Sequence, residues 1–228
     1  MMRPNAPAVL RLRLASMLLA APAAADPGWL VRYEVRFAHG EDGVPEAAVE
    51  GLLEWTAPAE PAPAWVALEM PDDGFPGGYG SHLRGFEAQV PPGSPEPHAY
   101  EAYPLAPEHG RHLLAVLADG RAGFRYTVRL EHDASEWGPG PDEAPYAFEG
   151  GAFWTGRALF ACPREARAEL VLHAPEDGRV SAAFEPLAPP GRSAYAVDDP
   201  GALWHSFLMV GRHEEARFEH GDSEVIVA

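Results

Sequence analysis

The chain has 228 residues, of which 46% are hydrophobic and 22% charged, and this balance excludes a disordered polyelectrolyte and a polytopic membrane protein. Thirty-four acidic residues against 17 basic ones, all arginine, give a formal net charge of −17. So acidic a surface repels phosphate backbones and argues against nucleic-acid binding, and the single cysteine, Cys162, excludes an intrachain disulfide framework and a cysteine-rich zinc site.

The first 25 residues have the three parts of a secretory signal peptide. A basic start with three arginines is followed by an apolar segment at Leu14–Leu19, and Ala23-Ala24-Ala25 precedes Asp26 in the pattern that signal peptidase accepts. The apolar segment is too short to cross a bilayer of about 30 Å as a helix. We predict cleavage after Ala25 and a secreted or periplasmic mature chain; an uncleaved N-terminal anchor is the alternative.

The clearest strand begins directly after this segment. From Trp29 to Phe37 the odd-numbered residues are large and apolar, and they alternate with Leu30, Arg32, Glu34 and Arg36. A period of two indicates a strand with one buried and one largely solvated face. Further strands in the first part of the chain are predicted at Val49–Trp55, Trp65–Met70, Leu83–Val90, His112–Leu117 and Phe124–Leu130. The last two flank Asp119-Gly120, which predicts a hairpin. In Phe124–Leu130, Phe124, Tyr126 and Val128 alternate with Arg125, Thr127 and Arg129, so we expect these three in the sandwich interior together with Tyr33 and Val35.

The second part of the chain continues with short apolar segments separated by Gly- and Pro-rich turns. Glu165–Leu172 also fits one or two helical turns, although a strand is our prediction there. The segments predicted as strands are Ala158–Ala161, Ala168–His173, Arg179–Phe184, Ala194–Val197, Trp204–Val210, Ala216–Glu219 and Glu224–Val227. With 23 Gly, 25 Pro and no long helical pattern, the sequence predicts an all-β fold, an antiparallel β-sandwich of many short strands, as one domain over residues 26–228.

Ten histidines raise the question of a metal site. His213-Glu214-Glu215-Ala216-Arg217 approaches a zinc-peptidase motif, in which two histidines four residues apart on a helix share one ion. Arg217, a permanent cation, occupies the second position and cannot be a ligand, so we expect a solvated charged edge. His109 and His112 are three residues apart, and we expect a surface pair there. No metal ligand is predicted.

Other catalytic patterns are weak. The sequence has no G-x-S-x-G motif, no phosphate-binding loop and no dinucleotide fingerprint. Ser81 and His82 are adjacent, so on a strand their side chains would point to opposite faces. The acidic pairs Asp72-Asp73 and Asp198-Asp199 are typical of turns. Of six tryptophans, Trp137 and Trp154 lie nearest to turn signals and are the two we consider for exposed contacts with a ligand.

Several segments occur in an order known from one protein family. They are Met70-Pro71 with Pro76-Gly77-Gly78-Tyr79, Phe124–Val128, Tyr146–Gly151 with Ala158–Phe160, Ala196–Pro200 and Ser223–Ala228. Together they resemble the N-terminal all-β domain of the glycyl aminopeptidase family, peptidase family M sixty-one. A tryptophan of that family's loop is missing here, and the longer stretch Asp72–Phe75 stands in its place. In the family this domain precedes a thermolysin-like zinc domain, and a PDZ domain often follows.

The resemblance implies a domain without a catalytic residue of its own, because the family's zinc motif and catalytic glutamate belong to the following domain. Pro76, Gly77 and Tyr79 correspond to structural loop positions. We therefore expect an exported, non-catalytic domain without a cofactor, which bounds a substrate cleft or docks on a catalytic domain or another protein, either alone or as part of a longer enzyme. The alternatives are a free peptide- or carbohydrate-binding module and a hydrolase of unrecognised type.

Overall fold

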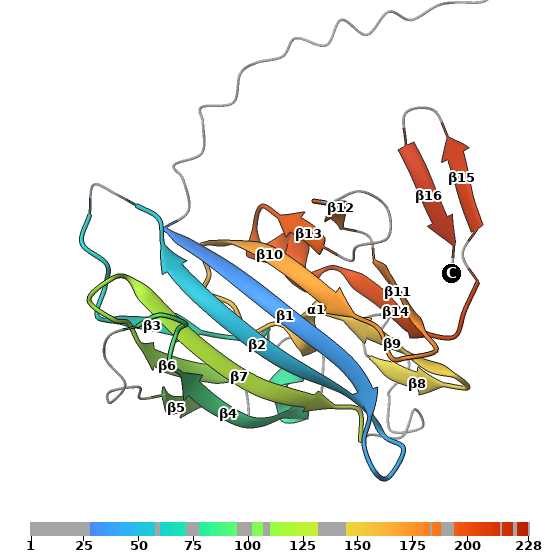
Figure 1. The fold of residues 1–228 in the computed structure, drawn as a ribbon, viewed down its shortest axis with the longest axis horizontal. Coiled ribbons are helices and arrows are strands. Elements are labelled where there is room, and N and C mark those ends of the chain that lie inside the picture. Colours follow the sequence, from blue (N-terminus) through green and yellow to red (C-terminus); the bar gives the residue numbers. More distant parts are fainter. Residues whose placement is uncertain are drawn as a thin grey trace, which may run out of the picture.

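A computed structural model describes residues 28–57, 60–71, 78–94, 102–106, 110–131, 145–182, 184–187, 194–214, 216–220 and 223–227. Strands dominate these residues and form a seven-stranded sheet, a four-stranded sheet, a three-stranded sheet and a separate hairpin. The large sheet crosses the front of the molecule in Figure 1, and the two smaller sheets lie behind it. The predicted all-β sandwich is confirmed. The predicted signal peptide lies outside the described residues.

The large sheet has the strand order β12-β13-β10-β1-β2-β7-β4. Most neighbours are antiparallel, but β1 and β10 run parallel, which the sequence did not predict. Its strands are β1 Trp29–His39, β2 Pro45–Trp55, β4 Leu83–Gln89, β7 Arg121–Arg129, β10 Ala166–His173, β12 Glu185–Pro186 and β13 Ala194–Val197. The two longest strands, β1 and β2, have 11 residues each and are longer than expected.

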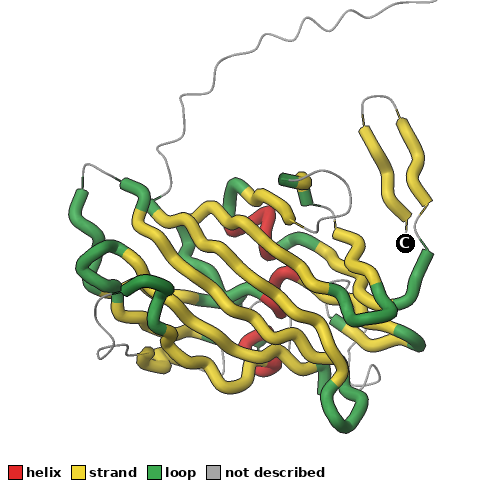
Figure 2. Tube along the Cα trace, in the orientation of Figure 1, coloured by secondary structure: helices red, strands yellow, loops and turns green. Residues whose placement is uncertain are grey.

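The smaller sheets form the second layer. The three-stranded sheet consists of β3 Trp65–Leu68, β6 Arg111–Ala115 and β5 Ala102–Ala106, and the four-stranded sheet of β11 Arg179–Ala182, β14 Phe207–Gly211, β9 Gly151–Thr155 and β8 Tyr146–Phe148. Three short helices, η1 Tyr79–His82, α1 Gly156–Leu159 and α2 Pro200–Trp204, lie along the middle of the molecule (Figure 2). The hairpin of β15 Ala216–His220 and β16 Ser223–Val227 stands apart from the sandwich in Figure 1.

The core lies between the large sheet and the smaller sheets. The alternating residues of β1 and β7 that we expected inside are buried: Tyr33, Val35, Phe124, Tyr126 and Val128 are each at most 3% exposed. Their rings pack together, with 6.0 Å between the ring centres of Tyr33 and Phe124 and an almost parallel arrangement of Phe124 and Tyr126. Period-two alternation therefore identified the inner face of these strands correctly.

A buried connection crosses the core at α1 and the residues after it. Leu159, Phe160 and Ala161 are fully buried, so the backbone there needs internal hydrogen-bond partners. The Tyr126 hydroxyl donates to the carbonyl of Leu159 (2.7 Å) and accepts from the amide of Ala161 (3.0 Å). The Tyr33 hydroxyl donates to the carbonyl of Ala161 (2.8 Å). Phenol groups from β1 and β7 thus hold this connection in place.

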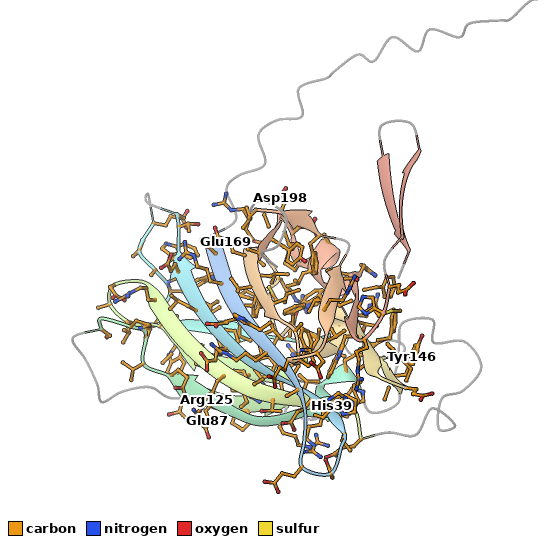
Figure 3. The ribbon with its side chains drawn as sticks, turned by 45° about the vertical axis from the view of Figure 1, so that its right-hand side comes forward. His39, Glu87, Arg125, Tyr146, Glu169 and Asp198 are labelled. Atoms are coloured by element: carbon orange, nitrogen blue, oxygen red, sulfur yellow. The ribbon has the colours of Figure 1, made fainter. Side chains whose placement is uncertain are left out.

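The outer face of the large sheet carries paired charges across neighbouring strands. Arg32 on β1 donates to Glu169 on β10 (2.7 Å) and to Glu54 on β2 (2.5 Å). Arg125 and Glu87, 2.6 Å apart, form a similar pair on β7 and β4, and Figure 3 shows them side by side. Opposite charges on adjacent strands favour this register and keep the face solvated.

Three sequence predictions about local structure are wrong. Residues Ala158–Ala161 form no strand: Ala158 and Leu159 end helix α1, and Phe160 and Ala161 follow it. All four are apolar and buried, so periodicity carries no information there. Trp204–Val210 is divided between α2 and β14, because Asp199 caps a helix that starts with Pro200. The turn at Asp119-Gly120 forms, but β6 and β7 belong to different sheets and make no hairpin.

Candidate functional site

The segment that approaches a zinc motif is not helical. His213 follows β14, whereas Arg217 lies on β15, so no helical face brings the two positions together. The Nε2 atom of His213 lies 2.5 Å from the Oγ atom of Ser181 on β11. Among the described residues, no three His, Cys, Asp or Glu side chains are grouped so that they could hold a metal ion. His109 lies outside the described residues.

The Ser181–His213 contact was not predicted from the sequence. A serine within hydrogen-bond reach of a histidine is the geometry of a nucleophile with its base. However, Ser181 is only 8% exposed, so a substrate has little access to its hydroxyl. The contact instead joins the residues after β14 to β11. It therefore does not support the hypothesis of an unrecognised hydrolase.

The remaining candidates that the structure describes contribute to packing or to helix capping. Ser81 and His82 lie on η1 and not on a strand, and His82 is buried. The Asp199 carboxylate accepts a hydrogen bond from the amide of Ala202 (2.8 Å) as the N-cap of α2. Asp72-Asp73 lies outside the described residues. The expected surface position of His112 is wrong: it is 5% exposed, and its ring stacks on Phe86 at 3.9 Å.

Of the two tryptophans considered for ligand contacts, the structure describes only Trp154. Trp154 is 1% exposed and packs against Phe37 in the core, so this prediction is wrong. Trp137 lies outside the described residues. The residues around Trp154 are all uncharged, and the sequence therefore gives no sign of whether Phe153 or Trp154 points inward. The structure turns Trp154 inward and leaves Phe153 on the outer face of β9.

Phe153 belongs to a row of aromatic side chains on the outer face of the four-stranded sheet. Tyr146 on β8 lies directly opposite Phe153, with 5.1 Å between the ring centres, and Phe207 on β14 stacks on its other side at 5.5 Å. Tyr146 is 37% and Phe207 is 41% exposed. We call these three residues the aromatic ladder; Figure 3 labels Tyr146 at the edge of this sheet.

The ladder is the outward half of an alternating pattern whose inward half fills the core. Trp154 and Leu208, the neighbours of Phe153 and Phe207 in sequence, are buried in the core. Met209 lies opposite Phe153 and extends the apolar row on the outer face. A sheet that is apolar on both faces is typical of a layer covered by another protein surface. The aromatic ladder is therefore our candidate functional site.

No protein-family model matches the sequence, and no curated protein matches it. Solved structures do match. An aminopeptidase N family protein from Idiomarina loihiensis is similar over 86% of this chain, with a TM-score of 0.61 and 15% identity, and the match covers 32% of that protein. At 15% identity, the match shows that the two proteins share a fold in this region and shows nothing beyond that. The chain thus spans about a third of the length of that protein.

Other matching structures have lower scores. Aminopeptidase A from Legionella pneumophila, in complex with aspartic acid, matches 90% of this chain and 24% of its own, with 11% identity and a TM-score of 0.47. An M1 zinc metallopeptidase from Deinococcus radiodurans matches 87% of this chain and 45% of its own, with 12% identity and a TM-score of 0.41. In each of them, too, the matched region is less than half of the protein.

Proposed function

We propose that this chain is the non-catalytic β domain of a zinc-aminopeptidase-like protein and that it packs against the catalytic domain through the aromatic ladder. The observation that carries the proposal is the exposed stack of Tyr146, Phe153 and Phe207 on a sheet whose other face is already buried. The fold likeness to about a third of an aminopeptidase N family protein supports a catalytic domain of the aminopeptidase type as the partner.

The sequence motifs and the fold likeness point to the same broad group and differ in detail. The motifs around Tyr79, Phe124 and Phe160 resemble the glycyl aminopeptidase family, whereas the solved structure that matches with a TM-score of 0.61 is an aminopeptidase N family protein. The broader assignment, a β domain of the zinc aminopeptidase type, agrees with both. The narrower assignment to family M sixty-one rests on the motifs alone.

The role of such a domain is to bound the cleft in which the catalytic domain holds its peptide. We propose that the chain cleaves no aminoacyl substrate on its own, because its sequence has no complete zinc motif and Arg217 stands where a second ligand is needed. The expected signal peptide supports a location outside the cytoplasm. Among the described residues, no helix is both long and apolar enough to cross a membrane.

A reconstitution experiment tests this function. The reading frame after codon 228, or a neighbouring gene, is searched for an H-E-x-x-H motif, and the zinc-binding segment found is purified and mixed with this chain. We expect a stable complex by size-exclusion chromatography and zinc-dependent cleavage of an aminoacyl substrate only in the mixture. Replacing Phe207 with Asp places a charge in the ladder and should abolish the complex.

The matched control is Val171→Asp. Val171 is 43% exposed on β10, on the outer face of the large sheet and away from the ladder, so a charge there should leave the complex intact. Equal loss with both substitutions would contradict the role of the ladder. Stoichiometric zinc in the isolated chain, together with chelator-sensitive peptidase activity, would contradict the proposal as a whole.

A further inference from the structure

A groove with tryptophan walls lies at the end of the sandwich where β1 begins and β2 ends. It has a volume of about 920 Å³ and is open to solvent. It lies on the three-stranded-sheet side of the molecule, because β3 and the start of β6 form part of its wall, and so it is distinct from the aromatic ladder on the four-stranded sheet. Its lining includes Trp55, Trp65, Glu60, Glu69, Arg111 and Glu165.

Two indole rings provide its flat apolar surfaces. Trp55 is fixed on one side by Trp29, with an edge-to-face contact at 5.1 Å, and its Nε1 atom donates to the carbonyl of Glu60 (3.0 Å). Trp65 is 41% exposed and is supported by Tyr103, whose ring centre lies 5.5 Å away. Both rings are therefore held in place before any ligand arrives, which lowers the entropic cost of binding.

The charged side chains of the groove are of both signs. Glu69 is largely shielded and forms ion pairs with Arg164 and with Arg111, the latter at 3.6 Å. Glu60 and Glu165 add two exposed carboxylates at the rim. Three carboxylates and two guanidinium groups thus stand beside the two indoles. Donors and acceptors are both available, while the local charge nearly cancels.

The two indole rings and the nearly balanced charges limit which class of ligand fits the groove. A polyanion would meet three carboxylates on a chain of net charge −17, and a cationic peptide would meet the two arginines. Hydroxyl groups both donate and accept, so they can pair with guanidinium and carboxylate groups alike. A sugar ring also has an apolar face that packs on an indole. We propose that this groove binds a neutral oligosaccharide, independently of the function proposed above.

Carbohydrate binding was one of the alternatives that the sequence left open, but the groove lies at other tryptophans than those considered for it. The tryptophans considered for such contacts were Trp137 and Trp154, and Trp154 is buried. Trp55 ends β2 and Trp65 begins β3, and both side chains line the one groove. Nothing in the local sequence distinguishes Trp65 from a core residue.

Calorimetry and tryptophan fluorescence with the whole chain test the proposal. The probes are the neutral oligosaccharides maltohexaose, cellohexaose and chitohexaose, with hexa-arginine and a heparin hexasaccharide as charged alternatives. We expect at least one neutral probe to bind and to change the tryptophan emission. Trp65→Ala should weaken binding about tenfold or more, because it removes one of the two stacking surfaces. Glu165→Ala should weaken it less.

The control is Val171→Ala, which removes an exposed apolar side chain from β10 on the outer face of the large sheet and should leave the affinity unchanged. Circular dichroism and the melting temperature show whether each variant is folded. Binding of hexa-arginine or heparin alone, binding of no probe, or a neutral probe that binds equally well to folded Trp65→Ala would each overturn the proposal.

Discussion

The ring of Phe124 on β7 lies directly over Gly51, its partner on β2. A β-carbon at Gly51 would lie 2.1 Å from the ring, far inside van der Waals contact. The glycine is therefore required by the packing and not by a turn. We expect Gly51→Ala to lower the free energy of unfolding by about 1–3 kcal/mol through overpacking, and Phe124→Ala by about 3–5 kcal/mol through the cavity it leaves.

Arg125→Ala is the matched control, since it removes only an exposed ion pair with Glu87, which contributes about 0–1 kcal/mol. Urea unfolding of the variants gives these differences. Similar small effects for Phe124→Ala and Arg125→Ala would mean that the register of β7 against β2 is wrong.

The Tyr126 hydroxyl is the second test of the core. Tyr126→Phe leaves the Leu159 carbonyl and the Ala161 amide without this partner in a buried connection. Each unsatisfied group costs roughly 1–3 kcal/mol, so we expect a clear fall in melting temperature by scanning calorimetry. Tyr146→Phe, at an exposed position, should have little effect. A neutral result for Tyr126→Phe would indicate that the connection through α1 is held in another way.

Burial of His112 predicts a dependence of stability on pH. Desolvation lowers the pKa of its imidazole from the ordinary value of about 6.5. The unfolded chain therefore takes up the proton more readily, and this residue's contribution to stability is present above about pH 6.5 and is lost as the pH falls below it. The measurement is the free energy of unfolding between pH 7.5 and pH 5 in the native chain and in His112→Phe.

We expect a smaller loss in His112→Phe, because phenylalanine keeps the stacking on Phe86 and cannot be protonated. His39→Gln, at an exposed position, serves as control and should follow the native chain. Identical pH dependence in all three proteins would rule out His112 as a source of acid sensitivity.

Cys162 should be unreactive in the folded protein. It is 1% exposed, and burial raises the pKa of its thiol to about 12, whereas the thiolate is the reactive form. We expect the reaction with a disulfide reagent at pH 8 to be at least about 100-fold slower in the native chain than in urea, where the thiol pKa is near 8.5. Rapid native labelling would mean that the layer around α1 opens readily.

The export signal gives a prediction that does not depend on the structure. Ala23 and Ala25 match the two small-residue positions that signal peptidase requires, so the exported protein should begin at Asp26. N-terminal sequencing of the secreted or periplasmic protein measures this directly. A start at Met1, or well beyond Pro27, would contradict it.

The sequence predicted the buried face of a strand correctly where the opposite face is exposed to solvent. β1 and β7 alternate between apolar and charged residues, and their buried faces were identified correctly. It failed where a segment is buried on all sides, as at Phe160, because periodicity then vanishes. It also failed at Asp119-Gly120, since a tight turn fixes the local geometry and does not decide whether the two strands join the same sheet.

The two candidate sites could not be predicted for a related reason. Phe153 and Trp154 are adjacent and both aromatic, so only tertiary packing decides that the first points outward and the second inward. The groove needs Trp55, Trp65 and Glu165 together, which come from three separate parts of the chain. Such proximity over long sequence distances has no local signal.

The parallel pairing of β1 with β10 has a consequence for how the protein folds. Arg32 and its partner Glu169 are 137 residues apart, so β1 keeps an open edge until most of the chain has been synthesised. Contacts between such distant segments form slowly, and until they form, the unpaired edge of β1 can pair with strands of other chains. We therefore expect folding to be limited by the arrival of β10, so that a nascent chain lacking it would depend on chaperones more than the completed protein does.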